Sequence, residues 1–260
     1  MQEIITSREN AKIKYACKLA QSAAFRRSEG SFLAEGSKLC RELAKTLPLK
    51  VILYTEKALE KDPSLAKLCE QQYLVQPHVA DKLSDATTTQ GVFGIFQLPQ
   101  PGFDVLRRGG HYLALERVQD PGNVGALVRS AAGFGFDAVV LGPGCASPYA
   151  PKTLRSSMGA AGRIPVLEVP SLPDALDHLR QQGVTCLAAA LENSRPLSQV
   201  PGRFEGGLCV VIGSEGQGLT EQAVNACQIS VRIPMTDRVE SLNAGVAGGV
   251  LLWHFRGVEE

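Results

Sequence analysis

Hydrophobic and polar positions follow two different periods along the chain, which separates predicted strands from predicted helices. In the second half, near-continuous apolar runs such as Leu208–Ile212 are typical of parallel strands that are covered on both faces. The strands predicted there are residues 111–118, 137–141, 163–169, 185–191, 207–213 and 228–234. The predicted helices are residues 123–134, 151–160, 172–182, 219–227 and 242–255. This alternation predicts an α/β domain with a parallel sheet, whose ligands bind at the carboxyl ends of the strands.

The first half has the pattern of a smaller α/β unit. Its predicted helices are residues 8–24, 35–46 and 56–71, and its predicted strands are 49–54, 73–75 and 92–97. The stretch that follows contains Pro99, Pro101 and Gly102 without any periodicity, which is typical of a linker. We therefore expect a first domain over 1–98, a linker over 99–108 and a second domain over 109–260.

Composition narrows the class of protein. The chain has 260 residues, 44% of them hydrophobic, with 27 Lys and Arg against 26 Asp and Glu, which excludes disordered and fibrous proteins. It has neither a long uncharged apolar run nor the layout of a signal peptide, so we expect no membrane insertion and a cytoplasmic location. Seven scattered cysteines without a C-x-x-C pair and four isolated histidines predict neither a disulfide framework nor a metal site.

Charge is unevenly distributed along the chain. Residues 1–50 contain ten basic and five acidic residues, a net charge of +5, whereas the remainder carries −4. A basic segment on a nearly neutral protein is consistent with a local phosphate-binding face. The alternative is a solvated helix surface.

The first of three polar loops follows the predicted strand 111–118. It contains a Pro-Gly turn, then Asn123 placed as the cap of the next helix, and Arg129 about two helical turns further on. In isolation, Asn123 can be a plain helix cap and Arg129 a plain surface cation.

The second loop runs from Gly213 through Glu215 to Gly218, and its glycines allow a ligand to approach the backbone. A phosphate cradle is disfavoured there, because the order is G-x-x-G-x-G, no Lys-Ser/Thr pair follows, and Glu215 would repel a phosphate. The third loop precedes the closing helix, which Ser241 is predicted to cap. Asn243, just inside that apolar helix, is expected to be a buried amide that needs a partner.

Taken together, the three loops resemble the three motifs of a known family. Asn-x-Gly-x-x-x-Arg from Asn123, Ile-Gly-Ser-Glu-Gly-x-Gly-Leu from Ile212 and Ile-Pro-Met…Ser-Leu-Asn from Ile233 resemble motifs of the SpoU (TrmH) family of RNA ribose 2′-O-methyltransferases. Residues 148–160 also resemble the middle segment of that family, so that the resemblance spans about residues 111–256. The chain departs from the pattern at Asp237, where glycine is common, and at Ala244-Gly245, where Val-Ser is usual.

The resemblance implies a SPOUT-class α/β domain whose C-terminal part forms a deep trefoil knot and holds S-adenosylmethionine. The cofactor-binding residues it implies are Leu191, Gly213, Gly218, Ile233, Met235 and Leu242. Residues 1–98 are similar to the N-terminal α/β domain of larger members, which resembles ribosomal RNA-binding proteins. This similarity favours RNA as the partner, and large-subunit rRNA over tRNA. The family and the strongly apolar closing helix predict a homodimer, for which Leu251, Leu252 and Trp253 are the expected contacts. The alternative is that this helix packs entirely within its own chain.

The resemblance also implies catalytic roles. In the family the arginine at the position of Arg129 is proposed to activate the 2′-hydroxyl, but a guanidinium group stays protonated in proteins. We therefore favour a role for Arg129 in binding phosphate and stabilising the developing alkoxide. Glu215 is expected to organise backbone N–H groups of the knot, and Asn123, Ser241 and Asn243 to shape the loops or orient the substrate.

Two other classes of function compete with this interpretation. A catalytically idle RNA-binding or assembly protein is disfavoured by the intact residues Asn123, Arg129, Glu215 and Asn243. A nucleotide-dependent dehydrogenase is disfavoured because the dinucleotide fingerprint is missing.

Overall fold

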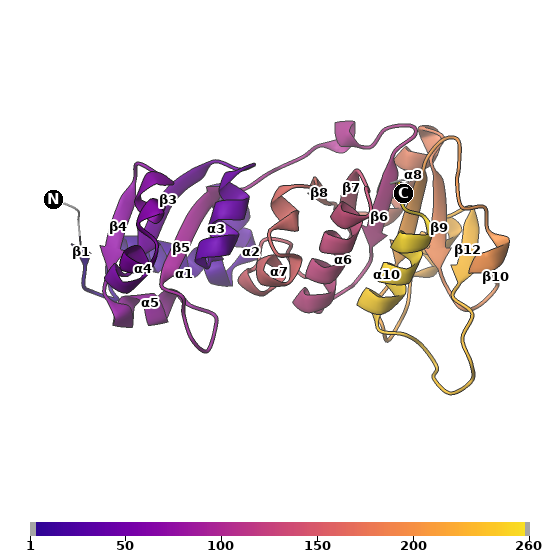
Figure 1. Ribbon diagram of the computed structural model, residues 1–260. Coiled ribbons are helices and arrows are strands. Elements are labelled where there is room, and N and C mark those ends of the chain that lie inside the picture. The colour runs from indigo at the N-terminus through magenta and orange to yellow at the C-terminus, as the bar shows by residue number, and fades with distance from the viewer. Residues whose placement is uncertain (1–3, 258–260) are drawn as a thin grey trace. The chain divides into compact units, whose positions relative to one another are not determined.

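The computed structural model describes residues 4–257, which form two compact units (Figure 1). The first unit comprises the residues up to Pro99 together with Ser147–Arg163. The second comprises Gln100–Ala146 and the residues from Ile164 onward. The division predicted from sequence placed 147–163 in the second domain, whereas its contacts group it with the first unit.

The second unit is built on a sheet of seven parallel strands in the order β10-β12-β9-β11-β6-β7-β8. Its strands are β6 (His111–Leu115), β7 (Ala138–Leu141), β8 (Val166–Glu168), β9 (Thr185–Ala189), β10 (Arg195–Pro196), β11 (Leu208–Ile212) and β12 (Ile229–Arg232). The six strands predicted for this unit and their parallel arrangement are confirmed, and the two-residue β10 is an addition. β11 lies at the centre with all five residues buried, as the apolar run requires.

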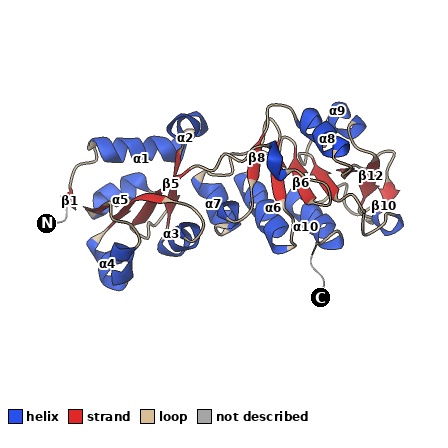
Figure 2. Cartoon of the chain, turned by 90° about the horizontal axis from the view of Figure 1, so that it is seen from above, coloured by secondary structure: helices blue, strands red, loops and turns tan. Residues whose placement is uncertain are grey.

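Helices cover both faces of this sheet (Figure 2). On one face, α8 (Leu172–Gln181) and α9 (Glu221–Asn225) join a buried cluster with alternate residues of the strands, including Tyr112, Val140 and Val211. The other face carries α6 (Pro121–Gly133) and α10 (Ala244–His254), which pack closely on each other. These two helices begin beside the loops that carry the predicted motifs.

Close packing of α10 depends on Gly248. A Cβ atom at this position would overlap Leu127 of α6 and lie 2.8 Å from Ile212 of β11. Leu251 and Leu252 are buried within the chain, so the prediction that they face a partner is wrong. The apolar side chains that α10 exposes are Val246 (54% exposed), Val250 (38%) and Trp253 (55%), spaced along one stripe of the helix.

The first unit contains a five-stranded sheet in the order β1-β4-β3-β5-β2. Its strands are β1 (Ile4–Ile5), β2 (Ser31–Glu35), β3 (Leu49–Tyr54), β4 (Gln72–Val75) and β5 (Val92–Gln97). Its helices are α1 (Ala11–Gln21), α2 (Ala23–Glu29), α3 (Ser37–Ala44), α4 (Glu56–Lys61), α5 (Pro77–Leu83) and α7 (Pro151–Ser157). Helices α1 and α5 pack on one face around Ile13, Val79 and Phe93.

Several elements of the first unit differ from the prediction. The helix expected over 8–24 is divided at Ser22, which accepts a hydrogen bond from Phe25 N and starts α2. The helix expected over 56–71 ends at Lys61 because Pro63 follows. Strand β2 and helix α5 were missed.

Short 3₁₀ turns complete the chain: Pro63–Lys67, Phe103–Val105, Ala160–Gly162 and Leu197–Gln199. None of the helices within residues 4–257 has the length and apolar character needed to cross a membrane.

Candidate functional site

The three polar loops of the sequence meet at the carboxyl ends of strands β6, β11 and β12. The structure joins them through one carboxylate, that of Glu215. Its Oε1 accepts hydrogen bonds from Asn123 Nδ2 at 2.8 Å, from the backbone N–H of Ala244 at 3.1 Å, and from Asn243 Nδ2. Asn243 Nδ2 also lies 3.2 Å from Asn123 Oδ1, which accepts from it. One residue of each loop therefore takes part in a single hydrogen-bonded cluster, which we call the Glu215 cluster (Glu215, Asn123, Asn243).

The helix caps at this site differ from the predicted ones. Asp120 caps α6, because its Oδ1 accepts from Asn123 N at 2.9 Å, so Asn123 lies inside the first turn and its amide is available to Glu215. Asn243, and not Ser241, caps α10, since its Oδ1 accepts from Val246 N at 3.2 Å. Asn243 is also exposed rather than buried, although its amide is fully engaged. Both predicted caps were wrong, and both corrections place an asparagine amide against Glu215.

The loop between β11 and α9 folds tightly back on itself. A Cβ at Gly213 would overlap the backbone carbonyl of Gly218, and Gly218 N donates to Ser214 O at 2.9 Å. Gly218 has a φ of 64°, in the left-handed region that favours glycine. Here the glycines allow the close approach of two backbone segments.

A second carboxylate, which the sequence interpretation missed, holds the far end of this loop. Glu116 follows β6 and is only 6% exposed. Its Oε2 accepts from Thr220 N at 2.8 Å and its Oε1 from Thr220 Oγ1 at 2.9 Å. Thr220 in turn caps α9. The signal in the sequence was a carboxylate placed directly after an apolar strand.

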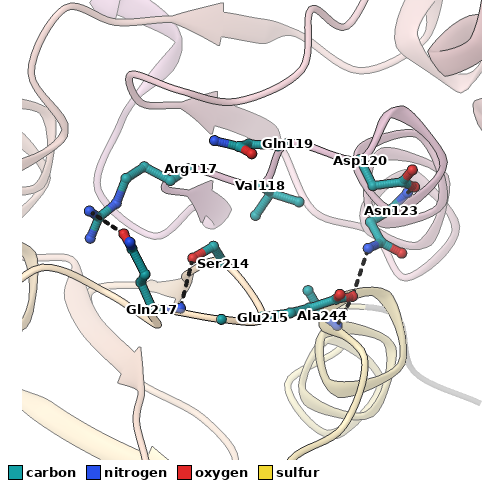
Figure 3. Close-up of a pocket in the computed structure, with 10 residues that line it drawn as sticks. Arg117, Val118, Gln119, Asp120, Asn123, Ser214, Glu215, Gln217 and Ala244 are labelled. Atoms are coloured by element: carbon teal, nitrogen blue, oxygen red, sulfur yellow. Dashed lines mark hydrogen bonds between the residues drawn. The ribbon is translucent and has the colours of Figure 1, made fainter.

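Two cavities share residues 214–217 and Ala244 as a common wall. The smaller one, here called the polar cavity, has a volume of about 330 Å³ (Figure 3). It is lined by Arg117, Val118, Gln119, Asp120, Asn123, Ser214, Glu215, Gly216, Gln217 and Ala244. The larger cavity has a volume of about 880 Å³, and Leu191, Gly213, Gly218, Ile233, Met235, Ser241 and Leu242 all contribute to its lining. The structure thus brings every predicted cofactor-binding residue to one cavity.

Arg129 is the predicted site residue that the structure leaves apart. It is exposed on α6 and lines neither cavity. Asn123 and Arg129 lie on the same helix six residues apart, so they point in different directions. Arg129 is consequently accessible to a large ligand that extends beyond the cavities.

The basic segment 1–50 is more engaged in internal contacts than its composition suggested. Arg26 is buried and donates to the carbonyls of Leu19 and Ala20 at 2.7 and 3.1 Å. Arg41 pairs with Asp62, whereas Lys38 is exposed.

A group of three or more His, Cys, Asp or Glu that could hold a metal ion is not found among residues 4–257.

Comparison with known proteins gives a consistent result. Residues 110–253 match the model of the SpoU rRNA methylase family, and residues 10–94 match that of the MRM3-like substrate binding domain. The chain is similar to the 23S rRNA (guanosine(2553)-2′-O)-methyltransferase RlmP of Bacillus subtilis, with 30% identity over 255 residues, 97% of this chain and 99% of that protein. It is also similar to the 23S rRNA (guanosine-2′-O-)-methyltransferase RlmB of Xanthomonas campestris pv. campestris, with 41% identity over 141 residues, 54% of this chain and 56% of that protein. A crystal structure of an AdoMet-bound rRNA methyltransferase from Sinorhizobium meliloti superimposes with a TM-score of 0.87 at 25% identity, covering 97% of both chains.

The backbone contact at Gly213 generates a stability prediction. Gly213→Ala should lower the free energy of unfolding by about 1–3 kcal/mol, because the new methyl group would lie 2.2 Å from the backbone of Gly218 and the loop would have to shift. Gly216→Ala in the same loop is the matched control: a Cβ there meets nothing within 4 Å, so its effect should stay within about 0.5 kcal/mol. Urea unfolding of both variants measures the difference, and equal effects would contradict the tight loop closure.

Proposed function

This chain belongs to the SpoU rRNA methylase family, and from that premise we propose that it transfers a methyl group from S-adenosylmethionine to a ribose 2′-hydroxyl of ribosomal RNA. The observation that carries the proposal is the Glu215 cluster, which joins the three motif loops at the wall between two cavities. One cavity is then available to the methyl donor and the other to the methyl acceptor. Such juxtaposition supplies much of the rate of a two-substrate reaction.

The larger cavity fits S-adenosylmethionine in size and chemistry. Its lining combines the apolar side chains of Leu191, Ile233, Met235 and Leu242 with backbone at Gly213 and Gly218. Apolar surfaces suit the faces of an adenine, and backbone N–H and C=O groups suit its edge. When bound, S-adenosylmethionine supplies an electrophilic methyl group on a sulfonium sulfur.

The residues of the chain position the substrates and stabilise charge. Glu215 fixes the amides of Asn123 and Asn243, and it also accepts from Ala244 N, which ties the start of α10 to the loop. We assign Asn123, Asn243 and Ser241 to orienting the loops and the target ribose. A guanidinium group does not act as a base in proteins. Arg129 is exposed outside both cavities, and we assign it to binding phosphate and stabilising the developing alkoxide of an RNA that extends beyond them.

RNA is the partner that the first unit is proposed to bind. Residues 10–94 match a substrate-binding domain, and the exposed Lys38 belongs to its basic segment. Ribosomal RNA is favoured over tRNA because two similar proteins, RlmP and RlmB, are named for 23S rRNA. We assign substrate binding to residues 1–98, with 147–163 packed alongside them, and methyl transfer to residues 109–260.

We also propose that two copies of the chain pair through α10 and that the second unit contains the trefoil knot of its family. The apolar stripe of Val246, Val250 and Trp253 supports pairing, because it is exposed on a helix whose other side is already buried. The knot is proposed because residues 110–253 match the model of that family.

The proposed activity has a direct test. The protein, incubated with radiolabelled S-adenosylmethionine and total RNA, should transfer label to ribosomal RNA, and nuclease digestion should release a 2′-O-methylated nucleoside. Calorimetry should detect binding of S-adenosylmethionine in the absence of RNA. Binding of NADH or ATP without any binding of S-adenosylmethionine would exclude the proposal.

Arg129→Ala should lower kcat by about 10²–10³-fold, the usual effect of removing one group that stabilises transition-state charge. The Kd for S-adenosylmethionine should not change, since Arg129 lines neither cavity. Arg129→Lys keeps the charge but loses the planar donor fork and should recover only part of the activity. An active Ala variant would remove Arg129 from catalysis. Arg108→Ala, at another exposed cation of the second unit, is the control.

Pairing through α10 predicts a mass of two chains by light scattering at micromolar concentration. Val250→Glu should convert the dimer to a monomer with an unchanged circular dichroism spectrum, because the charge would be buried in the interface. Ile4→Glu places the same charge on an exposed aliphatic residue of the first unit and should leave the dimer intact. A wild-type monomer would refute the pairing.

A further inference from the structure

Arg117 has an unusual backbone conformation beside the Glu215 cluster. Its φ is 55°, in the left-handed region that residues with a Cβ occupy rarely and at a cost. The glycine at position 144 leaves room for the Arg117 side chain, because a Cβ at Gly144 would lie 3.0 Å from Arg117 Cγ. Residues held in such conformations cluster at functional sites, so this arginine calls for a functional explanation.

The guanidinium group of Arg117 has unused binding capacity. Its Nη1 donates to Gln217 Oε1 at 3.0 Å, whereas its Nε is buried and has no hydrogen-bond partner among the residues that the structure describes. Arg117 makes no ion pair within that part of the chain either. A buried donor normally has an acceptor, so the chain alone does not satisfy this guanidinium group.

The polar cavity places this cation away from the nearby carboxylates. Figure 3 shows Arg117 and Gln217 at one end of the cavity and Asp120 and Asn123 at the other. Asp120 caps α6, and Glu215 Oε1 accepts three hydrogen bonds. The cavity therefore has one cationic end that can receive an anion and one end that presents the amides of the Glu215 cluster.

We propose that Arg117, oriented by Gln217, binds a backbone phosphate of the RNA next to the nucleotide that is methylated. This inference rests on the proposed function. A planar guanidinium fork matches two phosphate oxygens, and an anchored phosphate would hold the adjoining ribose near the wall that the two cavities share. Arg117 does not line the larger cavity, which argues against the carboxylate of S-adenosylmethionine as its ligand.

Arg117→Gly is the main test, because glycine adopts the left-handed conformation without strain and the variant should fold at least as well as the wild type. Its Kd and KM for RNA should rise about tenfold or more. The slope of log K against log salt should become less steep by about 0.7–0.9, the value for one phosphate contact. The Kd for S-adenosylmethionine should be unchanged, and kcat at saturating RNA should change much less than KM.

Three further variants separate the explanations. Arg117→Lys should retain the salt slope with weakened affinity, and Gln217→Leu should weaken RNA binding without altering the backbone at residue 117. Arg108→Gly, at an exposed loop cation of the same unit, should leave affinity and slope unchanged. Unchanged RNA affinity in Arg117→Gly would overturn the proposal. So would a raised Kd for S-adenosylmethionine with normal RNA binding, which would assign Arg117 to the cofactor.

These outcomes are distinguishable from failure of the proposed function. If the wild-type protein neither binds S-adenosylmethionine nor methylates RNA, the proposed function fails. The RNA-binding slope of Arg117→Gly would still decide whether this side chain contacts a phosphate.

Discussion

One carboxylate oxygen, Glu215 Oε1, holds the site together. It accepts hydrogen bonds from three N–H groups, which belong to residues at the starts of α6 and α10. The N-terminal end of a helix carries a partial positive charge, so a carboxylate beside two such ends is favoured by both dipoles as well as by its hydrogen bonds. Without Glu215, the amides of Asn123 and Asn243 would lose the acceptor that they share, and the three loops would lose the contact that joins them.

The loop that carries Glu215 is fixed at its other end by a second carboxylate. Glu116, at the end of β6, binds both the backbone and the hydroxyl of Thr220, where α9 begins. Within the same loop, Gly213 and Gly218 bring backbone against backbone. The wall between the two cavities is therefore rigid at both ends, which is what a site needs if it is to hold two reactants in a fixed relation.

The sequence predicted the sheet better than it predicted the site. Buried parallel strands such as β11 are nearly all apolar, and that signal is local. Helix caps are harder to assign from the sequence, because several residues close together can each accept from a helix N–H. Asp120 and Asn123 are both candidates for α6, and Ser241 and Asn243 for α10. The contact of both asparagine amides with Glu215 depends on a distant part of the chain, so the local sequence does not show it. Arg117 was missed because a left-handed φ at an arginine has no signature in the sequence.

Gly245 shows how a departure from the family pattern can be accommodated. The family usually has serine here, and glycine has no hydroxyl group with which to make a contact. In the structure, a Cβ at Gly245 would lie 3.1 Å from both Asn123 Oδ1 and Asn243 Oδ1, closer than most such contacts. A larger residue would therefore need both amides to shift by a few tenths of an ångström. In this chain, glycine at 245 leaves room for the direct approach of the Asn243 amide to Asn123 at 3.2 Å, beside Glu215.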